Sequence, residues 1–148
     1  MFKRIIYPTD FSESSNRSLS FALDVASSHQ SEMIIFYTYR LISSDSGRES
    51  MNGVSIKKEQ ENIAFKKFQK LRKAHPGFAK INYRFVVEVG FADERISSAI
   101  KTLDIDLLIL PESIQGKLEE NFELHKENFA THFHCPVLLV PSLPVDQY

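Results

Sequence analysis

The chain alternates between short apolar runs and longer segments in which apolar residues recur at helical spacing. Residues 4–8 and 33–39 are rich in branched and aromatic side chains and have the length of strands. Between them, apolar positions such as Leu19, Leu23 and Ala26 follow the spacing of a helix. Because residues 33–39 show no clean alternation of apolar and polar side chains, we expect an internal strand that is covered on both faces.

The same alternation continues to the end of the chain. The further predictions are a charged helix with an apolar stripe at Ile56, Ile63, Ala64, Phe68 and Leu71, a strand at residues 81–89, a helix at 91–103, a strand at 106–110, a helix at 118–133 and a strand at 136–140. Strands that alternate with helices in this rhythm favour right-handed βαβ crossovers. We therefore expect one α/β domain over residues 1–148, with a mainly parallel sheet between two helical layers.

Two polar stretches interrupt this pattern. Residues 43–53 contain four Ser and two Gly, which favours the longest loop of the chain. Ser, Asp and Asn residues also precede the first predicted helix, and we expect its N-cap among residues 14–16. The hydroxyls of Ser12, Ser14 and Ser15 offer a second possibility, a small anion bound at this helix N-terminus.

Length and composition narrow the class of protein. A chain of 148 residues, 43% hydrophobic and 25% charged, suits one domain with its own core. Its single cysteine excludes an internal disulfide, and apolar runs such as residues 137–140 are far too short to span a bilayer. The first residues lack the apolar stretch of a signal peptide. We therefore expect a cytoplasmic protein without membrane association.

Charge is balanced overall but unevenly distributed. The 18 basic and 19 acidic residues give a formal net charge of −1, which provides no field to attract nucleic acid. Residues 57–73 nevertheless hold seven Lys or Arg and two Glu, whereas residues 112–127 hold five Glu and two Lys. We expect both blocks to be solvated helix faces, and we expect no nucleic-acid partner.

Four stretches occur in the order and spacing of a known family. They are residues 5–14 (IIYPTDFSES), 90–96 (GFADERI), 106–109 (DLLI) and 135–141 (CPVLLVP). Together they resemble the universal stress protein family, and the resemblance covers essentially the whole chain. It implies a three-layer α/β/α fold with a five-stranded parallel sheet in the order 3-2-1-4-5, which is Rossmann-like and similar to the adenine nucleotide alpha hydrolases.

In such a sheet a ligand binds where the carboxyl ends of the strands face helix N-termini. The residues that we expect at this rim are Thr9, Asp10, Thr38, Gly90, Pro111 and Gly116. The resemblance implies that Asp10 and Thr38 match positions that lie around the adenosine of a bound nucleotide. Asp10 can instead cap the amides of its own turn, and the sequence leaves both roles open.

The family divides by a glycine signature after its fourth strand, G-x-x-G followed by nine residues and G-[S/T], whose backbone N–H groups hold the phosphates of ATP. In this chain the signature falls on Pro111, Ile114 and residues 124–125, and none of these is glycine. Gly116 is the only glycine of the region, and proline at position 111 also removes an N–H donor. We therefore expect no ATP and no other cofactor.

Charge favours the same interpretation. We expect Glu119, Glu120 and Glu123 at the start of the helix after the fourth strand, where they would satisfy the helix dipole and repel a triphosphate. The prediction is a regulatory or interaction protein of the stress response that does not bind ATP. The alternative is a nucleotide-binding switch with a degenerate phosphate loop.

Other reactive residues do not form a recognisable site. His125 and His132 lie seven residues apart on the predicted helix, with His134 and Cys135 just beyond, but this spacing fits no standard zinc module. Asp10 and His125 have no nucleophile or oxyanion motif beside them. We therefore expect neither a metal site nor an enzyme.

The last strand favours self-association. With the strand order that the resemblance implies, the segment from Pro136 to Pro141 is a sheet edge that is apolar on both faces and carries no charge. Antiparallel pairing with a second copy would satisfy its open backbone groups and bury Leu138 or Leu139. We expect a homodimer through this strand, and the sequence identifies no other protein partner.

Overall fold

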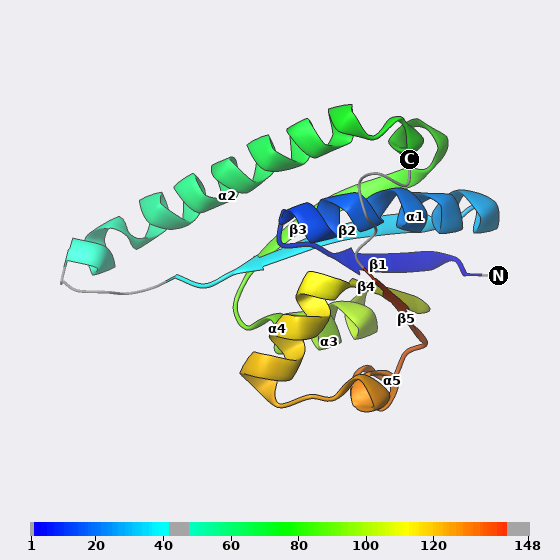
Figure 1. The fold of residues 1–148 in the computed structure, drawn as a ribbon. Helices are drawn as coiled ribbons and strands as arrows, with labels where there is room; N and C mark the ends of the chain where they lie inside the picture. The colour runs from blue at the N-terminus through cyan, green and yellow to red at the C-terminus, as the bar shows by residue number, and fades with distance from the viewer. Residues whose placement is uncertain (1, 42–47, 142–148) are drawn as a thin grey trace.

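The predicted sheet of five parallel strands is present, in the order β3-β2-β1-β4-β5 (Figure 1). The structure is a computed structural model that describes residues 2–41 and 48–141. The strands are β1 (Arg4–Pro8), β2 (Glu32–Tyr39), β3 (Asn82–Val89), β4 (Leu107–Pro111) and β5 (Val137–Val140). Every neighbouring pair is parallel, so the carboxyl ends of all five strands lie at the same end of the sheet.

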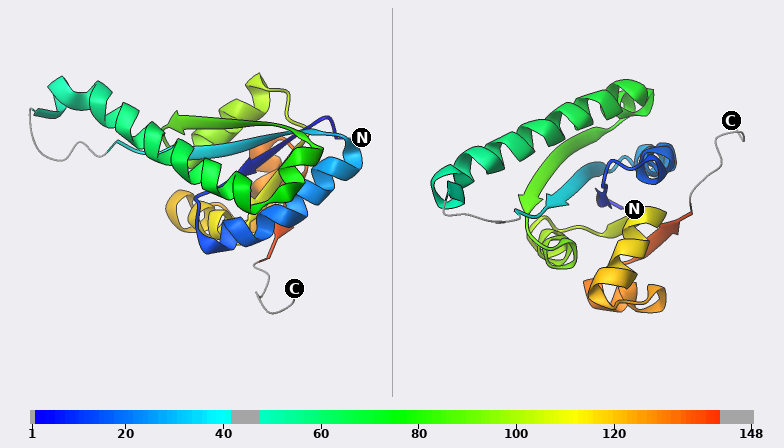
Figure 2. Two further views of the ribbon diagram at one scale, coloured as in Figure 1. Left: turned by 90° about the horizontal axis from the view of Figure 1, so that it is seen from above. Right: turned by 60° about the vertical axis from the view of Figure 1, so that its left-hand side comes forward.

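Helices cover both faces of this sheet, which confirms the three-layer prediction (Figure 2). One layer holds α1 (Glu13–His29), α2 (Arg48–Ala74) and the 3-10 helix η1 (Pro76–Lys80), and the other holds α3 (Ala92–Thr102), α4 (Glu112–Phe122), η2 (Lys126–Asn128) and α5 (Phe129–Phe133). Within the described ranges, no helix combines the length and the apolar character that crossing a membrane requires.

Two apolar clusters attach these layers to the sheet. Ile5 and Tyr7 of β1 belong to the cluster with α1 and α2, whereas Ile6 belongs to the cluster with α3, α4 and α5. Successive side chains of a strand alternate between faces, so a strand buried on both sides is apolar throughout. The polar end of Tyr7 is satisfied inside the core, because its hydroxyl donates to the carbonyl O of Ser15 at 2.7 Å.

The start of α1 differs from the prediction. Its N-cap is Ser12 and not one of residues 14–16. Ser12 Oγ accepts a hydrogen bond from the backbone N–H of Ser15 at 3.3 Å, so the helix already begins at Glu13. The polar residues that suggested a later start lie within the first turn, where the buried Ser15 hydroxyl finds partners in the turn after β1.

The predicted loop at residues 43–53 lies partly outside the described residues, which exclude 42–47. Its remaining residues, 48–53, are helical, because α2 begins at Arg48 and has 27 residues. A helix that is already nucleated by an apolar stripe extends readily, since each further residue adds one backbone hydrogen bond. The prediction from Ser and Gly content therefore placed the start of α2 too late in the chain.

Helix α2 is longer than the strand beneath it. At 1.5 Å per residue it spans about 40 Å, whereas the eight residues of β3 span about 26 Å. Its N-terminal half extends past the carboxyl ends of the strands (Figures 1 and 2). Ala64, Phe68 and Leu71 are buried as predicted, but Ile63 is 41% exposed. One residue before Ala64 is rotated by about 100° around the helix axis, which places Ile63 on the flank of α2.

The predicted helix at residues 118–133 is in fact divided between two α-helices, α4 and α5, with the 3-10 helix η2 between them. Helix α4 stops where Glu123 adopts a left-handed backbone with φ of 56°, and η2 and α5 follow. Leu118, Phe129 and Phe133 still belong to one apolar cluster, because α4 and α5 pack on the same face of the sheet. The spacing of these apolar residues therefore continues across the break, and in the sequence it looks like the spacing of one continuous helix.

Candidate functional site

A cleft of about 830 Å³ opens at the carboxyl ends of β1, β2 and β3. Four of the residues predicted for the rim line it, namely Thr9, Asp10, Thr38 and Gly90. They meet there because parallel neighbouring strands end at one edge of the sheet. Helices α3 and α4 supply further lining residues, and so does Gln60 of α2, so the cleft is bounded by the strand ends and by helices of both layers.

The other two residues predicted for the rim, Pro111 and Gly116, are not among those that line the cleft. Pro111 is buried at the end of β4, and α4 starts with the next residue, Glu112. Gly116 lies inside α4, with open space where a Cβ would stand. The strand therefore passes straight into the helix, with no loop between them.

Gly90 occupies a position that requires glycine. Its φ is 141°, a backbone conformation that other residues rarely adopt. Its N–H donates to the carbonyl O of Tyr39 at 2.9 Å, which ties the end of β3 to the end of β2. The turn at Gly90 leads β3 into α3 and brings the next residue, Phe91, to the cleft.

Asp10 joins the turn after β1 to helix α4. Its Oδ1 accepts hydrogen bonds from the backbone N–H of Ser12 at 3.0 Å and from the hydroxyls of Ser15 at 3.0 Å and Ser113 at 3.2 Å. Its Oδ2 lies 2.8 Å from Nζ of Lys117. The bond from the Ser12 amide is the local cap that the sequence suggested, and the contacts with Ser113 and Lys117 add a tertiary role.

These contacts keep Asp10 ionised. Burial alone would raise the pKa of Asp10, but the hydrogen bonds from Lys117 and Ser12, with the positive charge of Lys117, outweigh burial and hold this pKa well below its usual range. Only 12% of the Asp10 side chain is exposed. The floor of the cleft therefore carries a fixed pair of carboxylate and ammonium groups, and Asp10 exchanges no proton near neutral pH.

The same network speaks against a small anion at the start of α1. The hydroxyls of Ser12 and Ser15 both donate to Asp10 Oδ1. The carboxylate of Asp10 thus takes the place beside the helix N-terminus that an anion would take. We therefore assign these two hydroxyls to Asp10 and not to a bound ligand.

Planar side chains form part of the cleft wall. The guanidinium of Arg40 lies 4.3 Å from the ring centre of Phe91, and Phe91 meets Phe122 edge to face with ring centres 6.2 Å apart. On β2, the rings of Tyr37 and Tyr39 are stacked with an angle of 16° between their planes. No pattern in the sequence predicted this wall, although Phe91 directly follows the predicted rim glycine.

Tyr39 remains a neutral phenol at this wall. Its hydroxyl donates to Oε2 of Glu61 on α2 at 3.4 Å. Burial raises the pKa of Tyr39, and the negative charge of Glu61 raises it further. The cleft thus combines flat apolar surfaces, neutral hydroxyl groups and one fixed ion pair, a set of groups suited to binding a small molecule.

Glu119, Glu120 and Glu123 lie at the C-terminal end of α4, whereas the sequence predicted them at its N-terminal end. Because α4 begins at Glu112, its last turns contain Glu119 and Glu120, and Glu123 is its C-cap. The prediction placed them at the helix start because it assumed a phosphate loop before the helix. Glu119, Glu120 and Glu123 are therefore not close to the positive N-terminal end of the helix dipole. The acidic residue of the first turn of α4 is Glu112.

The histidine and cysteine residues near the C-terminus are separated or buried. His125 precedes η2 and His132 lies in α5, so the break after α4 removes the shared helix face that the sequence suggested. Across residues 2–41 and 48–141, no group of three or more His, Cys, Asp or Glu is placed to hold a metal ion. Cys135 is 6% exposed, and burial, with the nearby charge of Asp106, raises the pKa of its thiol to about 11.

The basic block lies on the solvated side of α2, as predicted. All seven of its side chains are exposed, namely Lys57, Lys58, Lys66, Lys67, Lys70, Arg72 and Lys73. The residues that attach this helix to the sheet, such as Phe68 and Leu71, lie on the other side. The charge is thus compatible with a freely hydrated helix face.

A family model, that of the universal stress protein family, matches residues 1–141. No curated protein sequence matches the chain. Among solved structures, universal stress protein UspA from Lactobacillus plantarum is 15% identical, with a TM-score of 0.70 over 93% of this chain and 97% of that chain. A likeness at this level of identity shows a shared fold.

Two further similar structures contain nucleotides. A universal stress protein in complex with cAMP is 17% identical, with a TM-score of 0.64 over 96% of this chain and 98% of that chain. A universal stress protein family protein from Arabidopsis thaliana with AMP bound is 13% identical, with a TM-score of 0.62 over 98% of this chain and 94% of that chain. These ligands belong to those proteins, and the similarity again shows the fold.

Proposed function

Because the chain belongs to the universal stress protein family, we propose that it is a non-enzymatic regulatory or interaction protein of the stress response that acts in the cytoplasm and does not bind ATP. The observation that carries this proposal is the junction between β4 and α4. Where the family's glycine signature would cradle phosphates, the buried Pro111 is followed directly by the first residue of a helix, Glu112.

Three properties of this junction disfavour a polyphosphate. Pro111 has no N–H to donate to a phosphate oxygen. Glu112 places a carboxylate in the first turn of α4, at the positive end of the helix dipole, where it competes with an anionic ligand. The hydroxyl of Ser113, the next residue, already donates to Asp10. The junction therefore lacks the backbone donor of residue 111 and carries one repelling charge.

Isothermal titration calorimetry of the purified protein with ATP and Mg²⁺ tests this proposal. We expect no binding with a Kd below about 100 μM, which corresponds to about −5.5 kcal/mol. A tighter Kd would overturn the proposal. Native mass spectrometry of freshly purified protein gives an independent result, because ATP or ADP that co-purifies with the chain would contradict the proposal as well.

The cleft supports a second candidate, a nucleotide-binding switch that recognises a base and a sugar without a polyphosphate. Its volume of about 830 Å³ and the planar wall near Asp10 and Thr38 favour a flat ligand with polar substituents. The cAMP and AMP complexes of similar folds point in the same direction. Calorimetry with AMP and cAMP separates the candidates: binding that is lost in Asp10→Ala, but kept in the exposed control Asp24→Ala, would favour the switch.

We also propose that the protein forms a homodimer through β5. This strand is an end strand of the described sheet and pairs with β4 on one side. Leu138 packs against the core, whereas Leu139 is 38% exposed, so Leu139 is the side chain available to a second copy. Pairing two such edges would satisfy their open N–H and C=O groups and close the assembly at two chains.

A further inference from the structure

A recess of about 420 Å³ lies between α1 and the last turns of α2, which lie side by side in the view from above (Figure 2). We call it the α1–α2 pocket, and it is lined by Phe11, Asn16 and five residues between positions 67 and 75. None of these residues lines the cleft. A volume of this size suits one small organic molecule.

Three apolar side chains line this pocket, those of Phe11, Leu71 and Ala74. Phe11 has a φ of 59°, which is uncommon for a bulky residue, and its N–H donates to Oγ1 of Thr9 at 3.1 Å. Consecutive residues of this turn serve two recesses, because Asp10 lines the cleft and Phe11 lines the α1–α2 pocket. Residues with a strained backbone are concentrated at binding sites and active sites. The pocket therefore offers an aromatic ring and two aliphatic side chains to an apolar ligand.

Positive charge is added by Lys67 and Lys70, which are exposed and lie about one helical turn apart on α2. Among the lining residues that the structure describes, none is acidic. Glu13, the acidic residue in the first turn of α1, is paired with Arg17. An anionic group in the pocket would therefore meet two ammonium groups and no lining carboxylate.

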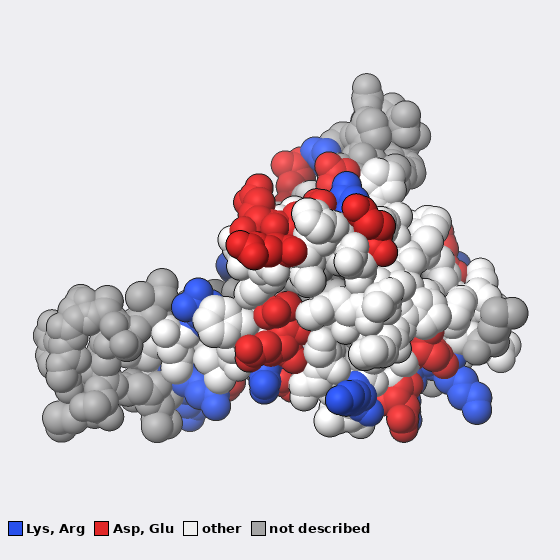
Figure 3. All heavy atoms as spheres, turned by 90° about the horizontal axis from the view of Figure 1, so that it is seen from below, with Lys and Arg blue, Asp and Glu red and all other residues white. Residues whose placement is uncertain are grey.

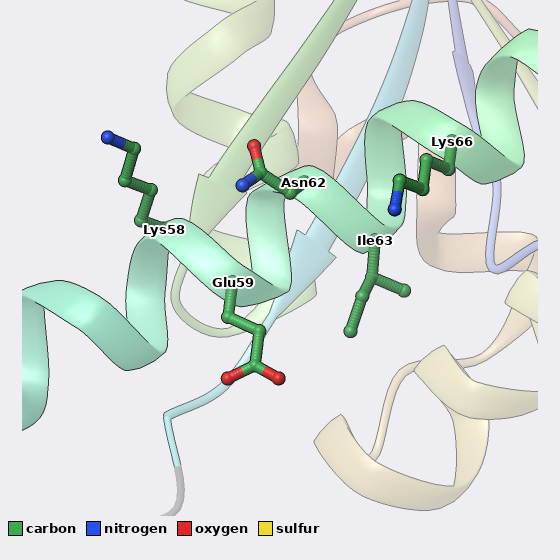
Figure 4. Close-up of a pocket in the computed structure, with 5 residues that line it drawn as sticks. All are labelled: Lys58, Glu59, Asn62, Ile63 and Lys66. Atoms are coloured by element: carbon green, nitrogen blue, oxygen red, sulfur yellow. The ribbon is translucent and has the colours of Figure 1, made fainter.

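Two other charged surfaces lack this combination. On the outer side of α2, Lys58 and Lys66 line a recess together with Glu59, so its charges are mixed (Figure 4). The face that is seen from below carries Asp and Glu side chains gathered in one area (Figure 3). We therefore expect an organic anion to prefer the α1–α2 pocket to either surface.

His75 joins the two helices beside the pocket. Nδ1 of its ring lies 2.9 Å from the carbonyl O of Leu71, and Nε2 lies 3.1 Å from the carbonyl O of Asn16. Carbonyl oxygens only accept, so both hydrogen bonds form together only when both ring nitrogens carry a hydrogen and the ring is a cation. In that form His75 adds a third positive charge to the wall of the pocket.

Asn16 leaves one polar atom of this wall unsatisfied. Its Oδ1 is buried and has no hydrogen-bond partner among the described residues, whereas its Nδ2 donates to the carbonyl O of Phe11 at 3.5 Å. Buried polar atoms nearly always have a partner. We therefore favour a ligand that carries a hydroxyl group as well as an acid.

We propose that the α1–α2 pocket binds a small aromatic carboxylic acid, such as 4-hydroxybenzoate. The ring of the acid packs against Phe11, Leu71 and Ala74. Its carboxylate contacts the ammonium groups of Lys67 and Lys70. A bare phosphate or a nucleic-acid backbone could use the lysines but would leave the apolar side chains uncovered, so the pocket favours an anion with an apolar body.

Titration of the isotope-labelled full chain with 4-hydroxybenzoate, followed by NMR of the backbone amides, tests this proposal. We expect saturable shifts of the amide signals of Asn16, Lys70 and His75, with a Kd below about 2 mM. The signals of Thr38 and Gly90, which line the cleft, should not shift. The compound 4-hydroxybenzyl alcohol keeps the ring without the charge, and acetate keeps the charge without the ring. Each should bind at least about tenfold more weakly than the acid.

Paired variants of α2 separate the pocket from the general charge of the helix. Lys67→Gln/Lys70→Gln should raise the Kd for 4-hydroxybenzoate at least about fivefold. Lys57→Gln/Lys58→Gln removes the same charge about 13 Å further along α2, which exceeds the Debye length of about 8 Å at physiological ionic strength, and should change the Kd by less than about twofold. Ala74→Leu adds bulk to the exposed lining without changing the charge and should raise the Kd at least about tenfold. Thermal unfolding of each variant establishes that the fold is kept.

Three results would overturn the proposal. One is the absence of saturable shifts up to about 10 mM 4-hydroxybenzoate. Another is a set of shifts at Thr38 and Gly90 without shifts beside the α1–α2 pocket, which would assign the acid to the cleft. The third is an unchanged Kd in Lys67→Gln/Lys70→Gln, or equally tight binding of 4-hydroxybenzyl alcohol, which would show that the two lysines do not hold the carboxylate.

Discussion

Nζ of Lys117 lies 2.8 Å from Oδ2 of Asp10, and this ion pair joins the turn after β1 to helix α4 at the floor of the cleft. The hydroxyl of Ser113, one helical turn earlier, contacts the other oxygen of the same carboxylate. Two side chains of α4 thus bind one acidic group of the β1–α1 turn. The pair therefore fixes the distance between the two walls of the candidate site.

Replacing Asp10 by Asn should destabilise the fold. We expect Asp10→Asn to lower the free energy of unfolding near pH 7 by about 1–3 kcal/mol, because Lys117 and the surrounding hydroxyls lose a charged acceptor. Urea unfolding followed by circular dichroism measures the change. Asp24→Asn, which alters an exposed acid on α1, serves as the control and should change the same quantity by less than about 0.5 kcal/mol.

The effect of Asp10 should also depend on pH in a defined direction. Because folding holds the pKa of Asp10 below its unfolded value, the stabilisation is complete above the unfolded pKa of about 4 and is lost as the pH falls through the folded pKa. The difference in unfolding free energy between wild type and Asp10→Asn should be constant from about pH 7 to about pH 5 and should shrink toward about pH 2. A difference that grows on acidification would contradict this assignment.

The two glycines predicted for the rim should respond in opposite ways to alanine. Gly90→Ala should lower the free energy of unfolding by about 1–2 kcal/mol, because alanine rarely adopts the positive φ found there. Gly116→Ala should raise it by about 0.5–1 kcal/mol, because this position is inside α4 and has open space for a Cβ. Thermal and urea unfolding of both variants compare the two positions directly. Equal effects at the two positions would show that the backbone at Gly90 is unstrained.

The β5 edge should control the oligomeric state. We expect light scattering to give about twice the chain mass of 17.0 kDa for the wild type. Leu139→Lys should yield a smaller assembly, because it places a charge on the exposed side chain of the edge strand. Phe21→Lys changes a similarly exposed apolar residue on α1 and should leave the mass unchanged. A wild type that is monomeric at micromolar concentration would contradict the β5 pairing.

Cys135 should be unreactive in the folded protein. The residue is 6% exposed and burial raises the pKa of its thiol to about 11, so little thiolate exists at pH 8. Reaction with a disulfide reagent at about pH 8 should be at least about tenfold slower in the native state than in denaturant. Comparable rates in the two states would mean that the C-terminal segment opens readily around this residue.

Local patterns in the sequence were sufficient for most elements of the fold. The apolar run of β2 predicted a strand buried on both faces, and its side chains do belong to both apolar clusters, because both layers of helices exclude water from it. Periodicity failed where two helices share one cluster, since Leu118 and Phe129 keep helical spacing across the break at Glu123. A spacing pattern indicates which side chains are buried together. It does not show that a residue between them, here Glu123, adopts a left-handed backbone and ends the helix.

The sequence by itself determined the strand and helix alternation and four residues of the rim, because each depends on local periodicity or on the common end of parallel strands. The edge position of the last strand followed from the strand order that the family resemblance implies. Only the tertiary structure decided that Lys117 binds Asp10, that Phe91 and Arg40 form a wall, and that Glu119 and Glu120 lie at the end of α4. These relationships join residues far apart in the chain, or depend on the residue at which a helix begins. Both are settled by how the elements pack on one another, and no pattern within a single segment contains that information.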